Sequence, residues 1–163
     1  MARIKEIFGI DVSRHNFGIK KEVLKEVVLE KELKKFIEIK EKIQSIEQAA
    51  ISDGRRYPNW SEIRPLKSEL RGYRKYWRTK YTDGFSHGLY RCTGQLRWQV
   101  GKVFGEFGTS WKNFNITSTD LFMYVRHDKL GNVELMNTRS SEIVKLPRGN
   151  AACDKFIKTG ENQ

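Results

Sequence analysis

The sequence predicts an α+β domain with a basic, helical centre between short strands. Apolar residues recur at helical spacing in the middle of the chain, and β-branched runs bounded by turn signals lie before and after it. The 163 residues are enough for a hydrophobic core, and 38% hydrophobic with 31% charged residues suits a folded protein with a very polar surface. We expect one compact domain over residues 1–147, with a basic-aromatic helical segment at 54–114, and a polar tail at 148–163.

The amino-terminal part predicts a strand and then a long helix. The apolar, β-branched run Ile7–Ser13 predicts a strand, and a turn signal follows it at Arg14–Asn16. Residues 17–29 fit either a second short strand or a helix, because their apolar period does not decide between the two. Over residues 30–50, apolar side chains recur at helical spacing among Lys and Glu, which predicts an amphipathic helix.

Two further helices are predicted in the middle of the chain. Gly54 and Pro58 mark a loop, after which a helix begins near Ser61 or, with Pro65 as its first residue, slightly later. Its expected buried stripe consists of Ile63, Leu66, Leu70, Tyr73 and Trp77. The third helix is expected over residues 89–107, with the stripe Leu89, Cys92, Leu96, Val100, Val103 and Phe107. Repeated glycines beside this stripe indicate close approach by a neighbouring helix or by a nucleic-acid strand.

The carboxyl-terminal part predicts short strands. Residues Leu121–Arg126 and Val133–Asn137 flank a turn that contains Gly131, which predicts a β-hairpin. The run Glu142–Leu146 ends at Pro147 and predicts a third strand. The domain would therefore consist of three main helices, flanked by one or two short strands and by a carboxyl-terminal hairpin.

Positive charge is concentrated in the middle third of the sequence. The formal net charge is +11, and residues 54–114 hold 13 Lys and Arg against 4 Asp and Glu, a net of +9. All four tryptophans and five of the six tyrosines also lie there. A cationic surface without interspersed acids repels itself unless a polyanion neutralises it, and arginine both forks onto phosphate and stacks on bases. This pattern predicts nucleic-acid binding.

The predicted interface combines cations that lie off the buried stripes with an aromatic side chain for stacking. Trp98 lies off the stripe of the third predicted helix, whereas Tyr73 and Trp77 lie on a stripe and are expected in the core. Further candidates for base contacts are Tyr57, Trp60 and Tyr76. The predicted nucleic-acid-binding residues are Arg55, Arg56, Arg71, Arg74, Lys75, Arg78, Lys80, Arg91, Arg97, Trp98 and Lys102.

The sequence favours a non-catalytic protein that binds RNA or DNA, with RNA or single-stranded segments preferred. A place in a larger nucleoprotein assembly, beside other proteins, would suit the same composition. The alternative is an interaction or inhibitor protein that docks its basic-aromatic face on an acidic protein, because Arg, Tyr and Trp are also the enriched hot-spot residues of protein interfaces.

Catalysis has little support in the sequence. The three histidines and two cysteines show no metal-ligand spacing, no phosphate-cradling glycine loop is present, and we expect neither a metal site nor a cofactor. The run GIDVS at Gly9–Ser13 resembles the first strand of ribonuclease-H-like and actin-like folds. That resemblance implies a further alternative, a metal-dependent nuclease fragment in which Asp11 binds metal.

The expected location is intracellular, in the cytoplasm or in the nucleoid or nucleus. The amino terminus lacks the apolar core of a signal peptide, and the two cysteines give no disulfide framework. The longest apolar runs are only a few residues, so no membrane partner is expected.

Overall fold

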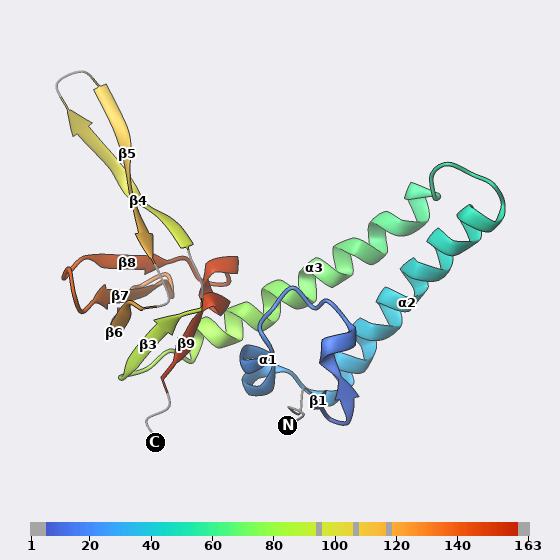
Figure 1. Cartoon of the computed structure of the whole chain (residues 1–163), viewed down its shortest axis with the longest axis horizontal. Coiled ribbons are helices and arrows are strands. Elements are labelled where there is room, and N and C mark those ends of the chain that lie inside the picture. Colours follow the sequence, from blue (N-terminus) through green and yellow to red (C-terminus); the bar gives the residue numbers. More distant parts are fainter. Residues whose placement is uncertain (1–5, 94–95, 106–107, 117–118, 160–163) are drawn as a thin grey trace. The chain divides into compact units, whose positions relative to one another are not determined.

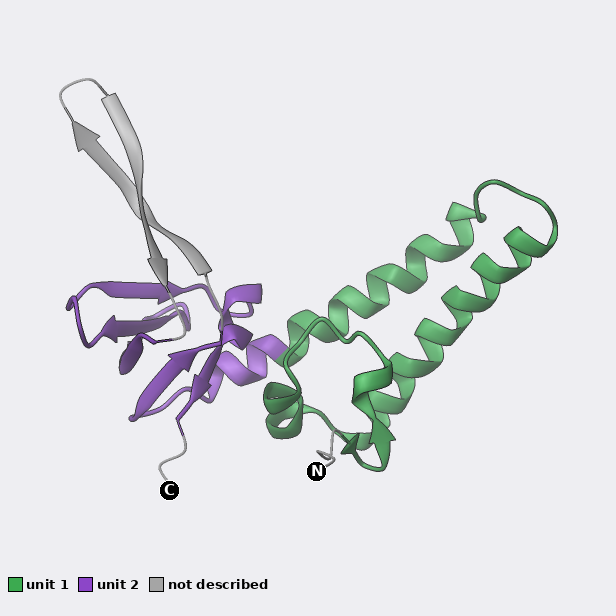
Figure 2. Cartoon of the chain, viewed as in Figure 1, with its two compact units in different colours: residues 1–77 green, residues 78–163 purple. Residues whose placement is uncertain are grey.

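The chain forms two compact units, residues 1–77 and residues 78–163 (Figure 2). The computed structural model describes the backbone of residues 6–93, 96–105, 108–116 and 119–159, and the side chains of residues 6–93 and 119–159. Three α-helices and several short antiparallel strands occur in this described part, which confirms the α+β class. Two compact units can belong to one domain, so the single domain expected over residues 1–147 stays a prediction.

The first unit contains a small hairpin, a short helix and two long helices (Figure 1). Its elements are β1 (Glu6–Ile7), β2 (Ile10–Asp11), the 3-10 helix η1 (Val12–Arg14), α1 (Lys21–Val27), α2 (Glu30–Ser52) and the part of α3 (Trp60–Asp83) that ends at residue 77. The helix predicted at 30–50 and the helix predicted to begin near Ser61 are confirmed. Residues 17–29, whose pattern fitted strand or helix, contain α1.

The strand predicted at Ile7–Ser13 is wrong, because the chain reverses inside it. Phe8 and Gly9 have φ angles of 55° and 78°, and β1 and β2 pair across this turn as an antiparallel hairpin of two residues each. Glycine reaches positive φ without a steric penalty, so Gly9 lets a β-branched run fold back on itself. Ser13 belongs to η1, whose first turn is capped by the side chain of Asp11.

The apolar stripes of α2 and α3 meet in an aromatic core. The ring centroid of Phe36 lies 5.4 Å from that of Trp77, 6.2 Å from that of Tyr73 and 5.2 Å from that of Phe17. The indole Nε1 of Trp77 donates a hydrogen bond to Glu32 Oε1 at 3.1 Å, so the polar atom of this buried ring is satisfied. Trp77 is fully buried and Tyr73 is partly buried, as their place on the stripe predicts.

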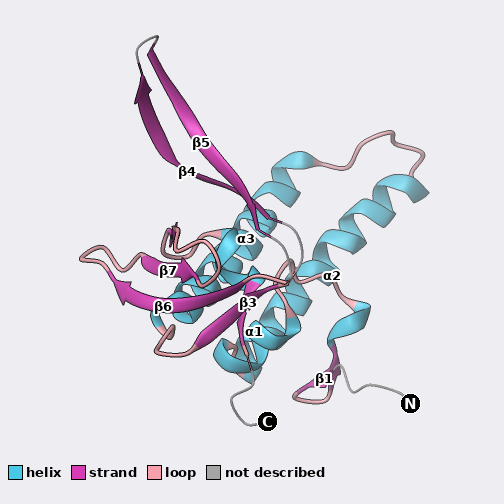
Figure 3. Ribbon diagram, turned by 60° about the vertical axis from the view of Figure 1, so that its left-hand side comes forward, coloured by secondary structure: helices cyan, strands magenta, loops and turns pink. Residues whose placement is uncertain are grey.

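The second unit centres on a five-stranded antiparallel sheet with the order β8-β7-β6-β3-β9. Figure 3 shows β6 between β7 and β3. After the end of α3, its elements are β3 (Leu89–Cys92), β4 (Leu96–Gly105), β5 (Gly108–Ile116), β6 (Leu121–His127), β7 (Val133–Asn137), β8 (Ile143–Leu146), the 3-10 helix η2 (Ala151–Lys155) and β9 (Phe156–Lys158). Strands β4 and β5 pair only with each other, in a separate two-stranded sheet. The predicted hairpin (β6 and β7) and the predicted third strand (β8) are confirmed.

The helix predicted over residues 89–107 is wrong, because this segment forms β3 and β4. Burial alternates along β3: Tyr90 and Cys92 are buried, whereas Leu89 and Arg91 are exposed, as expected for a strand with one covered face. The repeated glycines disfavour a helix, and the β-branched and aromatic residues between them favour strands. The apolar spacing alone did not distinguish these two structures.

Much of the segment expected to be a polar tail is folded. Residues 151–158 form η2 and β9, and β9 pairs antiparallel with β3, with Phe156 opposite Cys92. Phe156 and Cys153 are buried, and burial raises the pKa of the Cys153 thiol above its usual value. These apolar side chains hold the carboxyl-terminal segment on the sheet.

Candidate nucleic-acid interface

The cations that the first unit carries on α3 share one side of that helix. A helix turns by about 100° per residue, so positions three, four and seven apart share a side. The residues that share this side are Trp60, Arg64, Lys67, Arg71, Arg74 and Lys75. All of these except Arg74 are exposed. The two carboxylates of the same stretch, Glu62 and Glu69, fall on the opposite side together with Tyr76, so this row of cations contains no acid.

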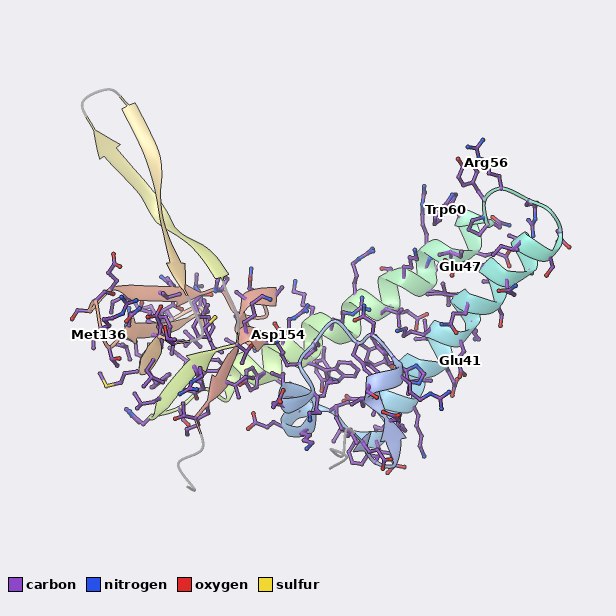
Figure 4. All side chains as sticks on the ribbon, in the orientation of Figure 1. Glu41, Glu47, Arg56, Trp60, Met136 and Asp154 are labelled. Atoms are coloured by element: carbon purple, nitrogen blue, oxygen red, sulfur yellow. The ribbon has the colours of Figure 1, made fainter. Side chains whose placement is uncertain are left out.

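Exposed aromatic rings and cations gather where α2 is joined to α3. Figure 4 shows Arg56 and Trp60 at this end of the helical hairpin. Tyr57 is 61% exposed and Trp60 is 47% exposed. The guanidinium carbon of Arg56 lies 5.6 Å from the centre of the Tyr57 ring, and the ammonium of Lys67 lies 5.4 Å from the centre of the Trp60 ring. Two large rings thus stand in solvent with a cation beside each.

A groove of about 490 Å³ runs between α2 and α3 on the cationic side. Its lining residues are Lys40, Ile43, Gln44 and Glu47 from α2, and Lys67, Leu70, Arg71 and Arg74 from α3. Four of these side chains are cations and only Glu47 is an acid. A second hollow between the same helices, of about 420 Å³, has Glu38 and Glu41 in its lining against the single cation Lys42. The two hollows therefore differ in the sign of their charge.

Two of the four groove cations are fixed by the loop that precedes α1. Arg74 Nε donates to the Phe17 carbonyl oxygen at 2.8 Å, and Lys40 Nζ donates to the Asn16 carbonyl oxygen at 2.7 Å. Burial lowers the pKa of Lys40, and the nearby charge of Arg74 lowers it further. Gly18 has φ +71°, and a Cβ there would stand 2.9 Å from Arg74 Nε, so glycine suits this tight approach both sterically and conformationally.

The predicted site residues divide between the two units. Arg71, Arg74 and Lys75 share the cationic side of α3. Arg55 and Arg56 are exposed in the preceding loop, where Arg55 pairs with Asp53 at 3.4 Å. Lys40, Arg64 and Lys67 complete the row and the groove but were left out of the predicted set. Lys40 reaches the groove only because α2 packs beside α3, and this tertiary contact cannot be seen in the sequence. Arg64 and Lys67, by contrast, share the helical spacing of the predicted residues on α3.

The other predicted residues belong to the second unit. Arg78 is largely buried, and its Nε lies 3.9 Å from Asp154 Oδ1, which gives this arginine a structural contact. Lys80 is partly buried on α3, and Arg91 is exposed on β3. Arg97, Trp98 and Lys102 fall on β4, and their side chains lie outside the described residues. Stacking by Trp98 therefore stays a prediction.

A metal-dependent nuclease site gains no support from the described residues. Asp11 Oδ1 accepts hydrogen bonds from the backbone nitrogen and the hydroxyl of Ser13, at 3.0 and 2.5 Å, so its carboxylate caps η1. Across residues 6–93 and 119–159, no group of three or more His, Cys, Asp or Glu side chains is placed to hold a metal ion.

Comparison with known proteins assigns the chain to no family. No protein-family model matches it, and neither a curated protein nor a solved structure matches it. None of the helices in the described ranges has an apolar stretch long enough to cross a membrane.

Proposed function

We propose that this protein binds nucleic acid without catalysing a reaction on it, with RNA or single-stranded segments as its preferred targets. The observation that carries the proposal is the row of cations on one side of α3, which follows the exposed Trp60, is exposed except at Arg74 and contains no carboxylate. Such a row is costly for an isolated protein, because its charges repel one another. A polyanion would remove that repulsion and would release its own counterions on binding.

The exposed rings support an unpaired strand over a closed duplex. Bases of a single strand are free to stack on aromatic side chains, whereas those of a duplex are already stacked on each other. Tyr57 and Trp60 stand in solvent at the end of the helical hairpin, each beside a cation. In the proposed complex the cations of α3 hold the phosphates, and these two rings stack on neighbouring bases.

The sheet of the second unit supports a place in a larger nucleoprotein assembly. Leu89, Met123, Met136 and Ile143 lie opposite one another across β3, β6, β7 and β8, and three of them are exposed apolar side chains. Contiguous apolar side chains on a surface are typical of protein contacts. We therefore include protein partners in the proposal, beside the nucleic acid.

The alternative proposal is that the cationic side of α3 docks on an acidic protein. The exposed Arg56, Tyr57 and Trp60 favour it, because arginine, tyrosine and tryptophan dominate the binding energy of many protein interfaces. The two proposals differ in one direct respect: only the first requires measurable affinity for RNA or DNA.

Replacing Trp60 with alanine is expected to weaken binding of a fluorescently labelled single-stranded RNA by about 1–3 kcal/mol, the value of one aromatic-base stack. Tyr76→Ala is the matched control. Tyr76 is 47% exposed, as Trp60 is, but it lies on the opposite side of α3 with the carboxylates. Fluorescence anisotropy titrations of both variants and the unmodified protein provide the measurement.

The contrast between the two variants decides the stacking role. Circular dichroism spectra must first show that both variants keep their helical content. Equal affinities of Trp60→Ala and Tyr76→Ala for the RNA would contradict stacking at Trp60. Absence of binding of the unmodified protein to any RNA or DNA, single- or double-stranded, would favour the acidic-protein alternative.

A further inference from the structure

The groove between α2 and α3 concentrates more positive charge than a single internal phosphate needs. Lys40, Lys67, Arg71 and Arg74 line it against the one carboxylate of Glu47, so four cations face one acid, a net of +3. An internal phosphodiester brings one negative charge. A terminal phosphate monoester brings close to two, and with the diester next to it the total is about three.

The four cations of the groove are of two kinds: two are held in place by hydrogen bonds, and two are exposed without a carboxylate partner among the described side chains. Arg74 and Lys40 are held by carbonyl oxygens of Phe17 and Asn16, so their positions cost little entropy on binding. Lys67 and Arg71 are exposed, and neither forms an ion pair with a carboxylate of the described side chains. The volume of about 490 Å³ lies within the range of small-ligand sites.

We propose that this groove binds two adjacent phosphate groups that together carry about three negative charges, as at the phosphorylated end of a nucleic-acid strand. Arg71 forks onto the terminal phosphate, and Lys67, Lys40 and Arg74 surround the pair. A bound anion would favour the charged form of Lys40 and would therefore raise its pKa, which burial and the charge of Arg74 lower. The choice of a strand end rests on the proposed function, whereas the affinity for paired phosphates does not.

The critical variant is Arg71→Gln, and Arg64→Gln is its matched control. Both arginines are exposed and lie on the same side of α3, but only Arg71 lines the groove. Both substitutions remove one positive charge and keep a long polar side chain. A difference between them therefore reports the groove and not the net charge.

The experiment compares two kinds of probe with each protein. The first is one single-stranded RNA sequence in three forms, with a 5′-phosphate, with a 3′-phosphate and with neither. The second is inorganic pyrophosphate alone, followed by calorimetry and by NMR of the Lys40 side chain. At low salt, we expect a terminal phosphate to strengthen RNA binding about tenfold in the unmodified protein and in Arg64→Gln, and this gain to disappear in Arg71→Gln.

The outcomes distinguish the failure of the groove proposal from the failure of the proposed function. Pyrophosphate binding that raises the pKa of Lys40 and is weakened in Arg71→Gln supports the groove as a phosphate site. If pyrophosphate binds in this way but no RNA binds, the proposed function alone is overturned. RNA binding of equal strength with and without a terminal phosphate would overturn the assignment of the groove to strand ends while the proposed function stands. Failure of both pyrophosphate and RNA to bind would overturn both proposals.

Discussion

Replacing Trp77 with alanine should lower the free energy of unfolding by about 3–5 kcal/mol, the usual cost of removing a large buried ring. The side chain is fully buried, and its ring centroid lies 5.4 Å from that of Phe36 and 5.5 Å from that of Tyr73. The variant also leaves Glu32 Oε1 without the indole hydrogen bond that it accepts. Chemical denaturation followed by circular dichroism measures the loss.

Tyr76→Ala is the control for this effect as well. Tyr76 precedes Trp77 on the same helix but is 47% exposed. Both substitutions replace an aromatic residue with alanine, the best helix former, so they differ in the burial of the ring that is removed. We expect the control to change the free energy of unfolding by no more than about 0.5 kcal/mol. Similar losses in the two variants would contradict the aromatic core between α2 and α3.

Removing three exposed cations from one side of α3 should abolish most nucleic-acid binding. The variant carries Arg64→Gln, Arg71→Gln and Lys75→Gln, none of which is buried. If each cation contacts one phosphate of a single strand, the slope of log affinity against log salt falls by about two units, because each contact contributes about 0.7. If the affinities of the variant and of the unmodified protein become equal near 1 M salt, the affinity of the variant at 0.1 M salt should be about a hundredfold lower.

A second triple variant separates position from net charge. Lys31→Gln, Lys34→Gln and Lys35→Gln remove the same charge from the exposed surface of α2, outside the lining of the groove. Its salt slope is expected to stay close to that of the unmodified protein. If the two triple variants lose equal affinity, binding depends on the total charge of the protein and the cationic side of α3 is not the interface.

The long helices could be predicted because their signals agree at several levels. In α2 and α3, apolar spacing, high helix propensity and a loop with Gly54 and Pro58 all give the same answer. At residues 89–107 the signals conflict, since a helical stripe coexists with repeated glycine and β-branched residues. The strand β3 pairs with β6 and β9, whose residues lie about 30 and 65 positions further along the chain, and such distant partners are not visible in a local pattern. The pairing of β4 with the next strand, β5, is local, but the apolar stripe alone gave no sign of it.

The candidate site could be predicted in composition but not in geometry. Clustered arginine and aromatic residues identified the basic segment, and the helical period placed Arg71 and Lys75 on one side. The inward contacts of Arg74 with Phe17 and of Arg78 with Asp154 span dozens of residues, so no local pattern reveals them. The same holds for Lys40, which reaches the groove from α2.

The central claim, that exposed cations of this protein bind the phosphates of a nucleic-acid strand, is tested most directly by the salt dependence of the unmodified protein. A labelled single-stranded RNA is titrated at several salt concentrations, and log affinity is plotted against log salt. Three to five phosphate contacts predict a straight line with a slope of about −2 to −3.5. A slope near zero, or no binding at the lowest salt concentration, would contradict the claim.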